Sequence, residues 1–260
     1  QGFLSVIIGE YRTGNMDGRS PQEIRNCPIV GTPEYPLELT IHGEKIPQLT
    51  RIVCQVPPGM GTNVSVVVVR AGSRSLEKYQ LNYIKPSVTR TSEEKVPTKG
   101  KNIMIYGNNF GDENAATCYL DDKPLATKTI GTSRSQLECM IPPGIGSTPR
   151  DIWVRVAGQD SCRKSITNSN CLGNALTIQY LPPKITDVQL PPAENRSTEG
   201  GFEITLVGDN FATAGVGSNV TIAGTNCMVT RTSFNEIKCI VQEAVGEDLG
   251  IQVSVGNQIS

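Results

Sequence analysis

Apolar and polar residues alternate with a period of two along much of this chain, and helical periodicity is nearly absent. In segments 152–156 and 251–255, every second residue is aliphatic and the residues between are largely polar. This alternation predicts strands with one face on a core. The same pattern, with a cysteine on the aliphatic face, recurs at 52–56, 137–141 and 237–241. Short strands bounded by Gly, Pro, Asn or Asp predict β-sandwiches, so the expected fold class is all-β.

Several phrases of the sequence recur at spacings of about 85 to 100 residues, which indicates one structural unit repeated in series. The phrase CQVPPGMG at 54–61 returns as CMIPPGIG at 139–146 and, degraded, as CIVQEAVG at 239–246. In step with it, IMIYGNNF at 103–110 matches ITLVGDNF at 204–211. We therefore expect three domains, at residues 1–85, 86–182 and 183–260.

The junctions between the expected domains contain proline and no Gly/Ser tether. They read LNYIKP at 81–86 and IQYLPP at 178–183. A strand that ends directly at one or two prolines leaves little freedom between neighbours. This favours a rod of tandem domains over loosely linked beads.

The motif IxIxGxNFG at 103–111, followed by LECxIPPG at 137–144 and by a VxVxG segment that ends at Gly158, resembles the IPT/TIG domain. The third unit shares GDNF at 208–211 but has QEA at 242–244 in place of PPG. The resemblance implies tandem immunoglobulin-like (E-set, IPT/TIG) sandwiches. Such domains occur in plexins, scatter-factor receptors and surface repeat proteins, and also in transcription factors and starch-acting enzymes, so the fold does not choose a function.

The cysteines form local pairs along the chain, and their number is even. None shows the C-x-x-C spacing of a zinc site, and a single histidine removes the usual co-ligand. Local pairing keeps each domain self-contained, and it predicts disulfides Cys27–Cys54, Cys118–Cys139, Cys162–Cys171 and Cys227–Cys239.

Three N-x-[ST] sequons begin at Asn63, Asn195 and Asn219, and we expect N-linked glycans on at least two of them. Sequons together with a cysteine pair in each domain favour an oxidising, secretory compartment, so the expected location is extracellular or at the cell surface.

Candidate catalytic and metal-binding residues are few. His42 is the only histidine, and no nucleophile motif accompanies it. The acidic pairs at 93–94, 121–122 and 247–248 fit solvated turns better than glycosidase carboxylates. The run 112–114 (DEN) lacks the spacing of a calcium loop. We therefore expect no enzyme activity, no cofactor and no metal, and we expect Trp153 to face outward from its strand.

The net charge and the hydropathy of the chain limit the classes of partner that it is expected to bind. With 24 basic and 25 acidic residues the net charge is −1, so no nucleic-acid partner is expected. No apolar stretch approaches the ~20 residues that span a bilayer. The third expected domain is acidic and the first two are slightly basic, which either favours head-to-tail association or is ordinary variation.

The repeats favour a non-enzymatic extracellular rod that adheres, spaces or builds a surface fibre through protein partners such as neighbouring copies. The alternative is the ligand-binding stalk of a plexin-like receptor. The first unit begins close to its Gly9 strand and the third stops before a closing strand, so both terminal domains are expected to be incomplete. Either a longer repeat protein or a strand from a neighbouring molecule would complete them. We expect residues 1–260 alone to self-associate or misfold.

Overall fold

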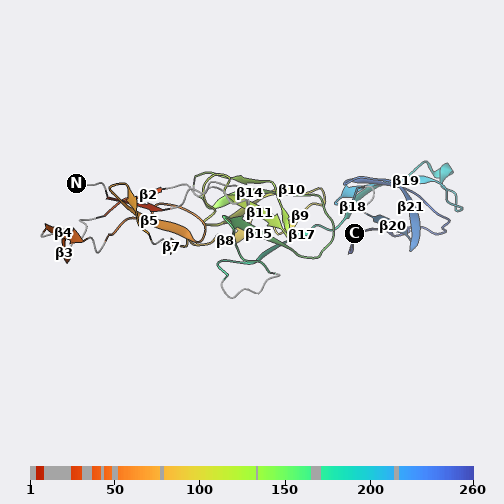
Figure 1. Ribbon diagram of the computed structural model, residues 1–260. Coiled ribbons are helices and arrows are strands. Elements are labelled where there is room, and N and C mark those ends of the chain that lie inside the picture. Colours follow the sequence, from red (N-terminus) through yellow and green to blue (C-terminus); the bar gives the residue numbers. More distant parts are fainter. Residues whose placement is uncertain are drawn as a thin grey trace. The chain divides into compact units, whose positions relative to one another are not determined.

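The computed structural model describes residues 4–8, 25–30, 37–41, 44–48, 52–76, 79–132, 134–164, 171–213 and 217–260. These residues form strands and loops, with one 3-10 turn, η1 (Ala193–Asn195), which confirms the all-β prediction. The chain divides into two compact units, Gln1–Pro86 with Arg155–Asp160, and Ser87–Val154 with Ser161–Ser260 (Figure 1). The expected three-domain division stays a prediction.

The first unit contains a five-stranded sheet in the order β2-β1-β5-β6, with β7 also paired to β5, and a separate β3–β4 hairpin. Antiparallel pairing places Val6 opposite both Cys27 and Val68. Val6, Ile8, Cys27 and Val64 form its buried core. The strands are β1 (Leu4–Ile8), β2 (Arg25–Cys27), β3 (Leu37–Ile41), β4 (Glu44–Gln48), β5 (Val64–Arg70), β6 (Ser73–Arg74) and β7 (Tyr79–Leu81).

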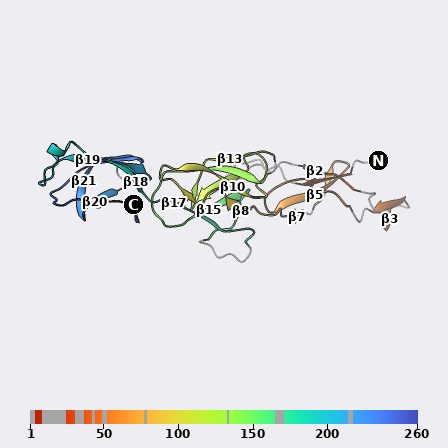
Figure 2. The same cartoon turned by 180° about the vertical axis from the view of Figure 1, so that it is seen from behind.

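We call the strands β8 to β17 the second sandwich. One sheet has the order β13-β14-β10-β8, and the other β12-β11-β15-β17-β9, with β16 forming a hairpin on β15. Strands β8, β10, β13, β15 and β17 of this sandwich can be followed in Figure 2. Alternate residues of β10, such as Ile103 and Ile105, are buried as the period of two predicts. The strands are β8 (Ser87–Thr91), β9 (Lys95–Val96), β10 (Lys101–Asn108), β11 (Ala116–Leu120), β12 (Lys123–Pro124), β13 (Thr127–Thr129), β14 (Gln136–Ile141), β15 (Arg150–Val156), β16 (Gln159–Asp160) and β17 (Leu176–Tyr180).

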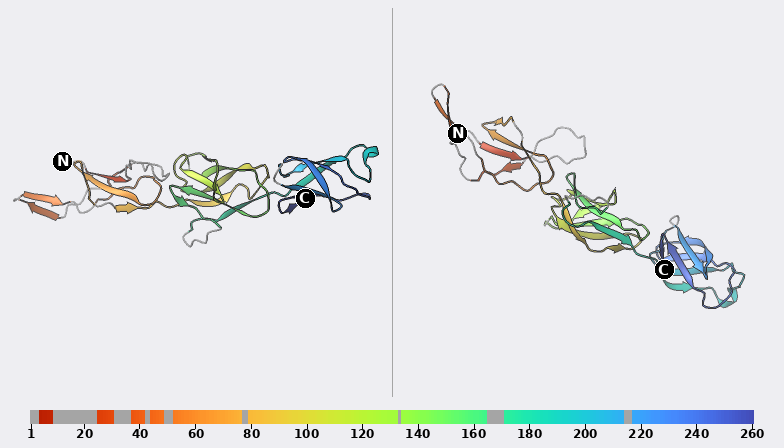
Figure 3. Two further views of the ribbon diagram at one scale, coloured as in Figure 1. Left: turned by 45° about the vertical axis from the view of Figure 1, so that its right-hand side comes forward. Right: turned by 90° about the horizontal axis from the view of Figure 1, so that it is seen from below.

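The strands β18 to β24, called the third sandwich here, form one hydrogen-bonded sheet in the order β18-β19-β22-β21-β20-β23-β24. These strands are drawn in teal to blue in Figure 3. β21 pairs with β20 through its first residues and with β22 further along, where the register shifts between Val229 and Arg231. The strands are β18 (Lys184–Gln189), β19 (Glu203–Asp209), β20 (Ser218–Ile222), β21 (Thr225–Thr232), β22 (Glu236–Ile240), β23 (Ile251–Val255) and β24 (Gln258–Ile259).

The repeated Gly-x-Asn-Phe phrase has a steric explanation. A Cβ on Gly107 would lie 2.0 Å from the Ser87 carbonyl oxygen and 2.6 Å from the Phe110 ring, and Gly208 is equally enclosed by its own neighbours. The asparagine of the phrase has a positive φ in both copies, 61° at Asn109 and 59° at Asn210, which asparagine tolerates better than most residues. The phrase therefore turns the chain at the end of β10 and again at the end of β19.

A serine closes the same hairpin in all three repeats, which fixes the correspondence between β5, β15 and β23. In each copy the serine N–H donates to the carbonyl of a strand valine, and the serine Oγ accepts from the N–H of that valine. The pairs are Ser75 with Val68, Ser161 with Val154 and Ser260 with Val253. We call β7 and β17 the closing strands. They pair with corresponding residues, β7 with Val64–Val66 of β5 and β17 with Arg150–Ile152 of β15.

Candidate functional site

Apart from Arg155–Asp160, the second and third sandwiches share one compact unit, and a set of specific contacts joins them. Thr98, only 1% exposed, donates from Oγ1 to the Phe211 carbonyl at 2.7 Å. Ile145, from the PPG loop of the second sandwich, packs against the core of the third. A buried hydroxyl without a hydrogen-bond partner is unfavourable, so the Thr98 hydroxyl stabilises the arrangement in which the Phe211 carbonyl lies beside it. We call this set of contacts the junction.

The β23–β24 hairpin completes the junction. Asn257 Oδ1 accepts from the Ser147 N–H at 2.9 Å, and Gln258 Nε2 donates to the Tyr180 carbonyl at 3.0 Å. The backbones approach closely, because a Cβ on Gly256 would lie 3.3 Å from the Gly146 Cα. The third sandwich is thus held to the PPG loop and the closing strand of the second by directional bonds.

The same residue types recur elsewhere in the chain. Within the first compact unit, Gln159 Nε2 donates to the Tyr83 carbonyl at 3.1 Å, as Gln258 does to Tyr180. Glutamine at the hairpin and tyrosine at the end of the closing strand are therefore a repeated pair. Sequence reasoning did not single out this pair, although the repeat register could have revealed it.

Tyrosine also explains why glycine follows the two prolines. The Tyr180 hydroxyl donates to the Pro142 carbonyl at 2.9 Å, and its ring covers Gly144 so closely that a Cβ there would lie 2.4 Å from Cζ. Tyr83 and Gly59 repeat this arrangement. Burial raises the pKa of the Tyr180 hydroxyl above its usual 10.0, and the nearby Arg150 partly opposes the shift. The phenol is therefore held neutral as a hydrogen-bond donor.

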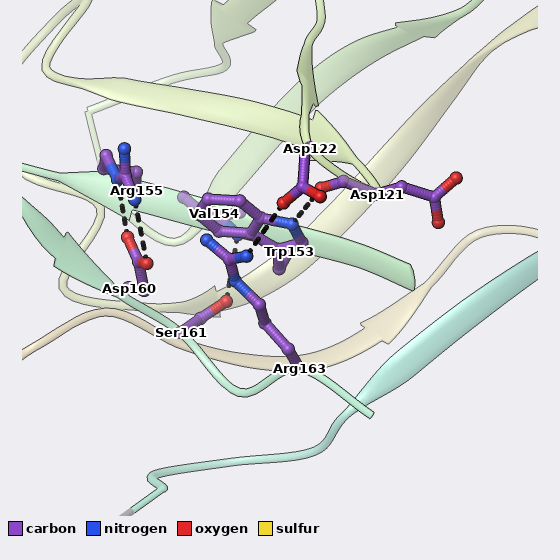
Figure 4. A network of polar contacts seen from close by, with 8 residues as sticks. All are labelled: Asp121, Asp122, Trp153, Val154, Arg155, Asp160, Ser161 and Arg163. Carbon is purple, nitrogen blue, oxygen red and sulfur yellow. Dashed lines mark hydrogen bonds and ion pairs between the residues drawn. The ribbon is translucent and has the colours of Figure 1, made fainter. Parts of the chain in front are cut away.

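The most elaborate polar network in the second sandwich surrounds Trp153 (Figure 4). Its ring stacks on Tyr119 with centroids 4.1 Å apart, and the Arg163 guanidinium lies 3.3 Å over the ring. Trp153 Nε1 donates to the Asp121 carbonyl at 2.5 Å, and Arg163 bonds Asp122 at 3.2 Å. Trp153 was expected to face outward from its strand, toward a neighbouring unit or a partner, but it is 1% exposed, because Arg163 returns from the loop after β16 to cover its ring.

Two further ion pairs border this network. Arg150 Nε bonds the Asp121 carboxylate at 2.8 Å, and Arg155 binds Asp160 through two nitrogens at 2.6 and 2.9 Å. A surface hollow of about 460 Å³ beside Trp153 is lined by Asp121, Asp122, Pro149, Asp151, Trp153, Arg163, Lys164 and Thr177. Its lining combines the carboxylates of Asp121, Asp122 and Asp151 with the cationic side chains of Arg163 and Lys164, so its chemistry is that of a polar contact surface.

The predicted site residues fall in three groups. The structure joins all four predicted cysteine pairs, with Cα–Cα distances of 5.5, 6.2, 5.2 and 5.6 Å, within the range for a disulfide. Such bonds are typical of an extracellular or cell-surface chain. The sequon residues Asn63, Asn195 and Asn219 are all exposed, and their glycosylation stays a prediction.

The candidate chemistry residues are not brought together. Of the acidic pairs, Glu93 makes an ion pair with Lys101, and Asp112 of the DEN run pairs with Arg134. His42 lies outside the described residues. Across the described ranges, no group of three or more His, Cys, Asp or Glu residues could hold a metal ion. Nor does any helix in that part of the chain have the length and apolarity to cross a membrane.

These observations define a class of protein: disulfide-linked, immunoglobulin-like β-sandwich repeats. The IPT/TIG domain model matches residues 86–172 and 183–260, which is more than half of the sequence. The chain belongs to the IPT/TIG family, as its motifs indicated.

Two curated relatives share this sequence pattern. Fibrocystin-L of Mus musculus is 29% identical over 201 residues, and Fibrocystin-L of Homo sapiens is 27% identical over 199 residues. Each alignment covers 74% of this chain and 4% of the relative. The chain thus spans about 4% of the length of these relatives.

Solved structures give weaker likenesses. The full extracellular region of plexin A4 aligns with 100% of this chain and 30% of its own, at 14% identity and a TM-score of 0.31. A surface glycan-binding protein from Prevotella bryantii aligns with 69% of this chain and 42% of its own, at 14% identity and a TM-score of 0.38. The family match, and not these alignments, carries the assignment.

Proposed function

We propose that this chain is a non-enzymatic extracellular repeat segment that acts as a structural or adhesive rod through protein–protein contacts. The observation that carries the proposal is the junction. A flexible tether would need no buried Thr98 hydroxyl and no Ile145 side chain lodged in the next sandwich. Specific contacts of this kind hold two neighbouring sandwiches at a fixed angle, which is what a structural rod requires.

The third sandwich presents the same outgoing face that the second uses in the junction. Thr198 and Val245 occupy the positions of Thr98 and Ile145, and Val245 is 78% exposed. An exposed aliphatic residue at a position that is buried in the neighbouring repeat supports a contact with a further sandwich of the same kind. The partners proposed are therefore other IPT/TIG sandwiches, from neighbouring copies or other surface proteins.

A bead-association assay tests the proposed contact between the face that carries Val245 and another IPT/TIG sandwich. Beads coated with the full chain should cluster, and Val245→Asp should reduce clustering by placing a carboxylate in the contact. Met228→Asp is the matched control, because Met228 is also an exposed aliphatic residue, at 56%, but lies on β21. Equal clustering of both variants would contradict the use of this face.

Negative-stain electron microscopy of the native material tests whether this chain is part of an extended rod. Gold-labelled antibodies against this segment should mark extended projections or filaments. Label on single membrane-anchored particles with a compact ligand-binding head would favour the receptor stalk instead. Label confined to compact particles without extension would refute the rod proposal.

A further inference from the structure

The second sandwich carries an insertion between β16 and β17 that the first unit lacks. In the first unit β7 begins at Tyr79, four residues after the closing Ser75, whereas β17 begins at Leu176, 15 residues after Ser161. Both closing strands nevertheless start at the same register on the strand beside them. The extra residues are therefore not needed to close a sandwich, and inserted loops of this kind commonly carry function.

A disulfide between Cys162 and Cys171 closes this insertion, of which residues 162–164 and 171–175 are described. All eight cysteines lie in the described ranges, and Cys171 is the only one of them that is exposed. Cys162 is 2% exposed and Cys54 is half-buried, while the remaining cysteines lie in strands and are at most 3% exposed. A thiol must reach a sulfur atom to break a disulfide, so accessibility selects the Cys162–Cys171 bond for reduction.

The residue beside the buried half of this disulfide covers Trp153. Arg163 places its guanidinium 3.3 Å over the Trp153 ring and bonds Asp122 at 3.2 Å (Figure 4). The ion pair contributes little by itself, because the Asp122 side chain is 92% exposed. The position of Arg163 therefore depends on how the chain around it is held.

Two anchors hold the chain around Arg163. On one side, Ser161 is bonded to β15 through its N–H and its Oγ. On the other side, the disulfide joins Cys162 to a segment that is bonded to β8. In that segment Asn174 donates from its N–H and its Nδ2 to two carbonyls of β8, at 2.8 and 2.7 Å. Breaking the disulfide removes the second anchor, so the chain around Arg163 is then held from one side only.

We propose that the Cys162–Cys171 disulfide is a redox modification site that a dithiol reduces selectively, and that its reduction uncovers Trp153. A thiolate of the dithiol attacks the Cys171 Sγ, the S–S bond breaks, and Cys162 leaves as a thiolate that takes up a proton. The Leu172 carbonyl lies 3.2 Å from the Cys162 Sγ, where it can accept from the new thiol. The second thiol of the dithiol then attacks its partner sulfur in the mixed disulfide and releases Cys171. The dithiol loses two electrons and two protons and becomes a disulfide, and the two cysteines become thiols.

Reduction changes what the side of the second sandwich presents. In the oxidised chain Trp153 is 1% exposed, and carboxylates and cationic side chains line the hollow beside it. When Arg163 moves away, the face of the Trp153 ring opens into this hollow. None of these residues belongs to the junction, so this redox site does not depend on the proposed rod.

Graded reduction of the native full chain with dithiothreitol tests the selectivity. Iodoacetamide traps the freed thiols, and peptide mapping identifies the labelled cysteines. Cys162 and Cys171 should be labelled while the other three disulfides are intact, and the emission of Trp153 should shift to longer wavelength in step with this labelling. Oxidised glutathione, added without the trap, should reverse the shift. Labelling of another pair at an equal or lower dithiothreitol concentration, or selective labelling without a change in emission, would overturn the proposal.

Arg163→Ala is the matched variant, because it removes the cover from Trp153 and leaves the disulfide in place. Its oxidised form should already show the long-wavelength emission, and reduction should add little further shift. An equal shift on reduction in the variant and in the unmodified chain would show that the disulfide does not act through Arg163, and would overturn the proposal. Far-ultraviolet circular dichroism should stay unchanged throughout. Loss of the β-sheet signal together with the emission shift would assign the shift to unfolding and would also overturn it.

Discussion

Replacing Gly144 by alanine should destabilise the second sandwich strongly, although the change adds only one methyl group. The new Cβ would lie 2.4 Å from Cζ and 2.5 Å from Cε2 and Oη of Tyr180. The ring is buried and its hydroxyl is bonded to the Pro142 carbonyl, so it must move and lose that bond. Overpacking costs about 1–3 kcal/mol and the lost hydrogen bond about 1 kcal/mol, so we expect a loss of about 2–4 kcal/mol.

Urea unfolding followed by tryptophan fluorescence measures this loss, because Trp153 is the only tryptophan of the sequence and lies in the second sandwich. The control is a double-mutant cycle with Tyr180→Leu, which removes the ring and hydroxyl. In that background Gly144→Ala should cost less than about 1 kcal/mol, the range of an ordinary surface change. An equal cost in both backgrounds would refute the proposed coupling between the glycine and the tyrosine.

Three further results are expected. Because the pKa of Tyr180 is raised in the folded state, stability should be full below about pH 10 and fall as pH rises through the folded pKa, and Tyr180→Phe should remove this part of the pH dependence. Replacing Cys162 and Cys171 by alanine should leave the sandwich folded but shift Trp153 emission, because the loop that carries Arg163 is no longer stapled; unchanged emission would contradict this. Endoglycosidase should lower the mass of the native protein by at least two glycans; an unshifted mass would refute glycosylation.

Local patterns in the sequence were enough to predict the strands, the repeat and the cysteine pairing. The alternation of apolar and polar residues in β10 reports directly which residues face the core. The phrases GNNF and PPG mark positions where a side chain cannot fit, and glycine recurs there: Gly107 and Gly208 in the first phrase, Gly59 and Gly144 in the second. The tyrosine that encloses the PPG glycine lies 24 residues further along in the first repeat and 36 in the second, so the pairing could not be read from either phrase alone.

The burial of Trp153 and the junction could not be predicted in the same way. Trp153 does lie opposite the core-facing residues of β15, but Arg163 covers it from a loop without periodicity. The junction depends on single polar residues, Thr98, Asn257 and Gln258, whose types are common on any surface. The sequence signal was the recurrence of Thr98 as Thr198 and of Gln258 as Gln159, and the hydrogen-bond register is needed to align these positions.

The central claim is that specific contacts hold the second and third sandwiches in one geometry. Double electron–electron resonance between spin labels at the exposed positions Lys128 and Thr225 of the full chain measures the distance between the two sandwiches directly. We expect one narrow distribution of the distance between the labels. The distribution should broaden when Thr98→Val, Ile145→Ser and Gln258→Ala are combined, because these substitutions remove contacts of the junction. A broad distribution in the unmodified chain, or the same narrow one in the triple variant, would contradict it.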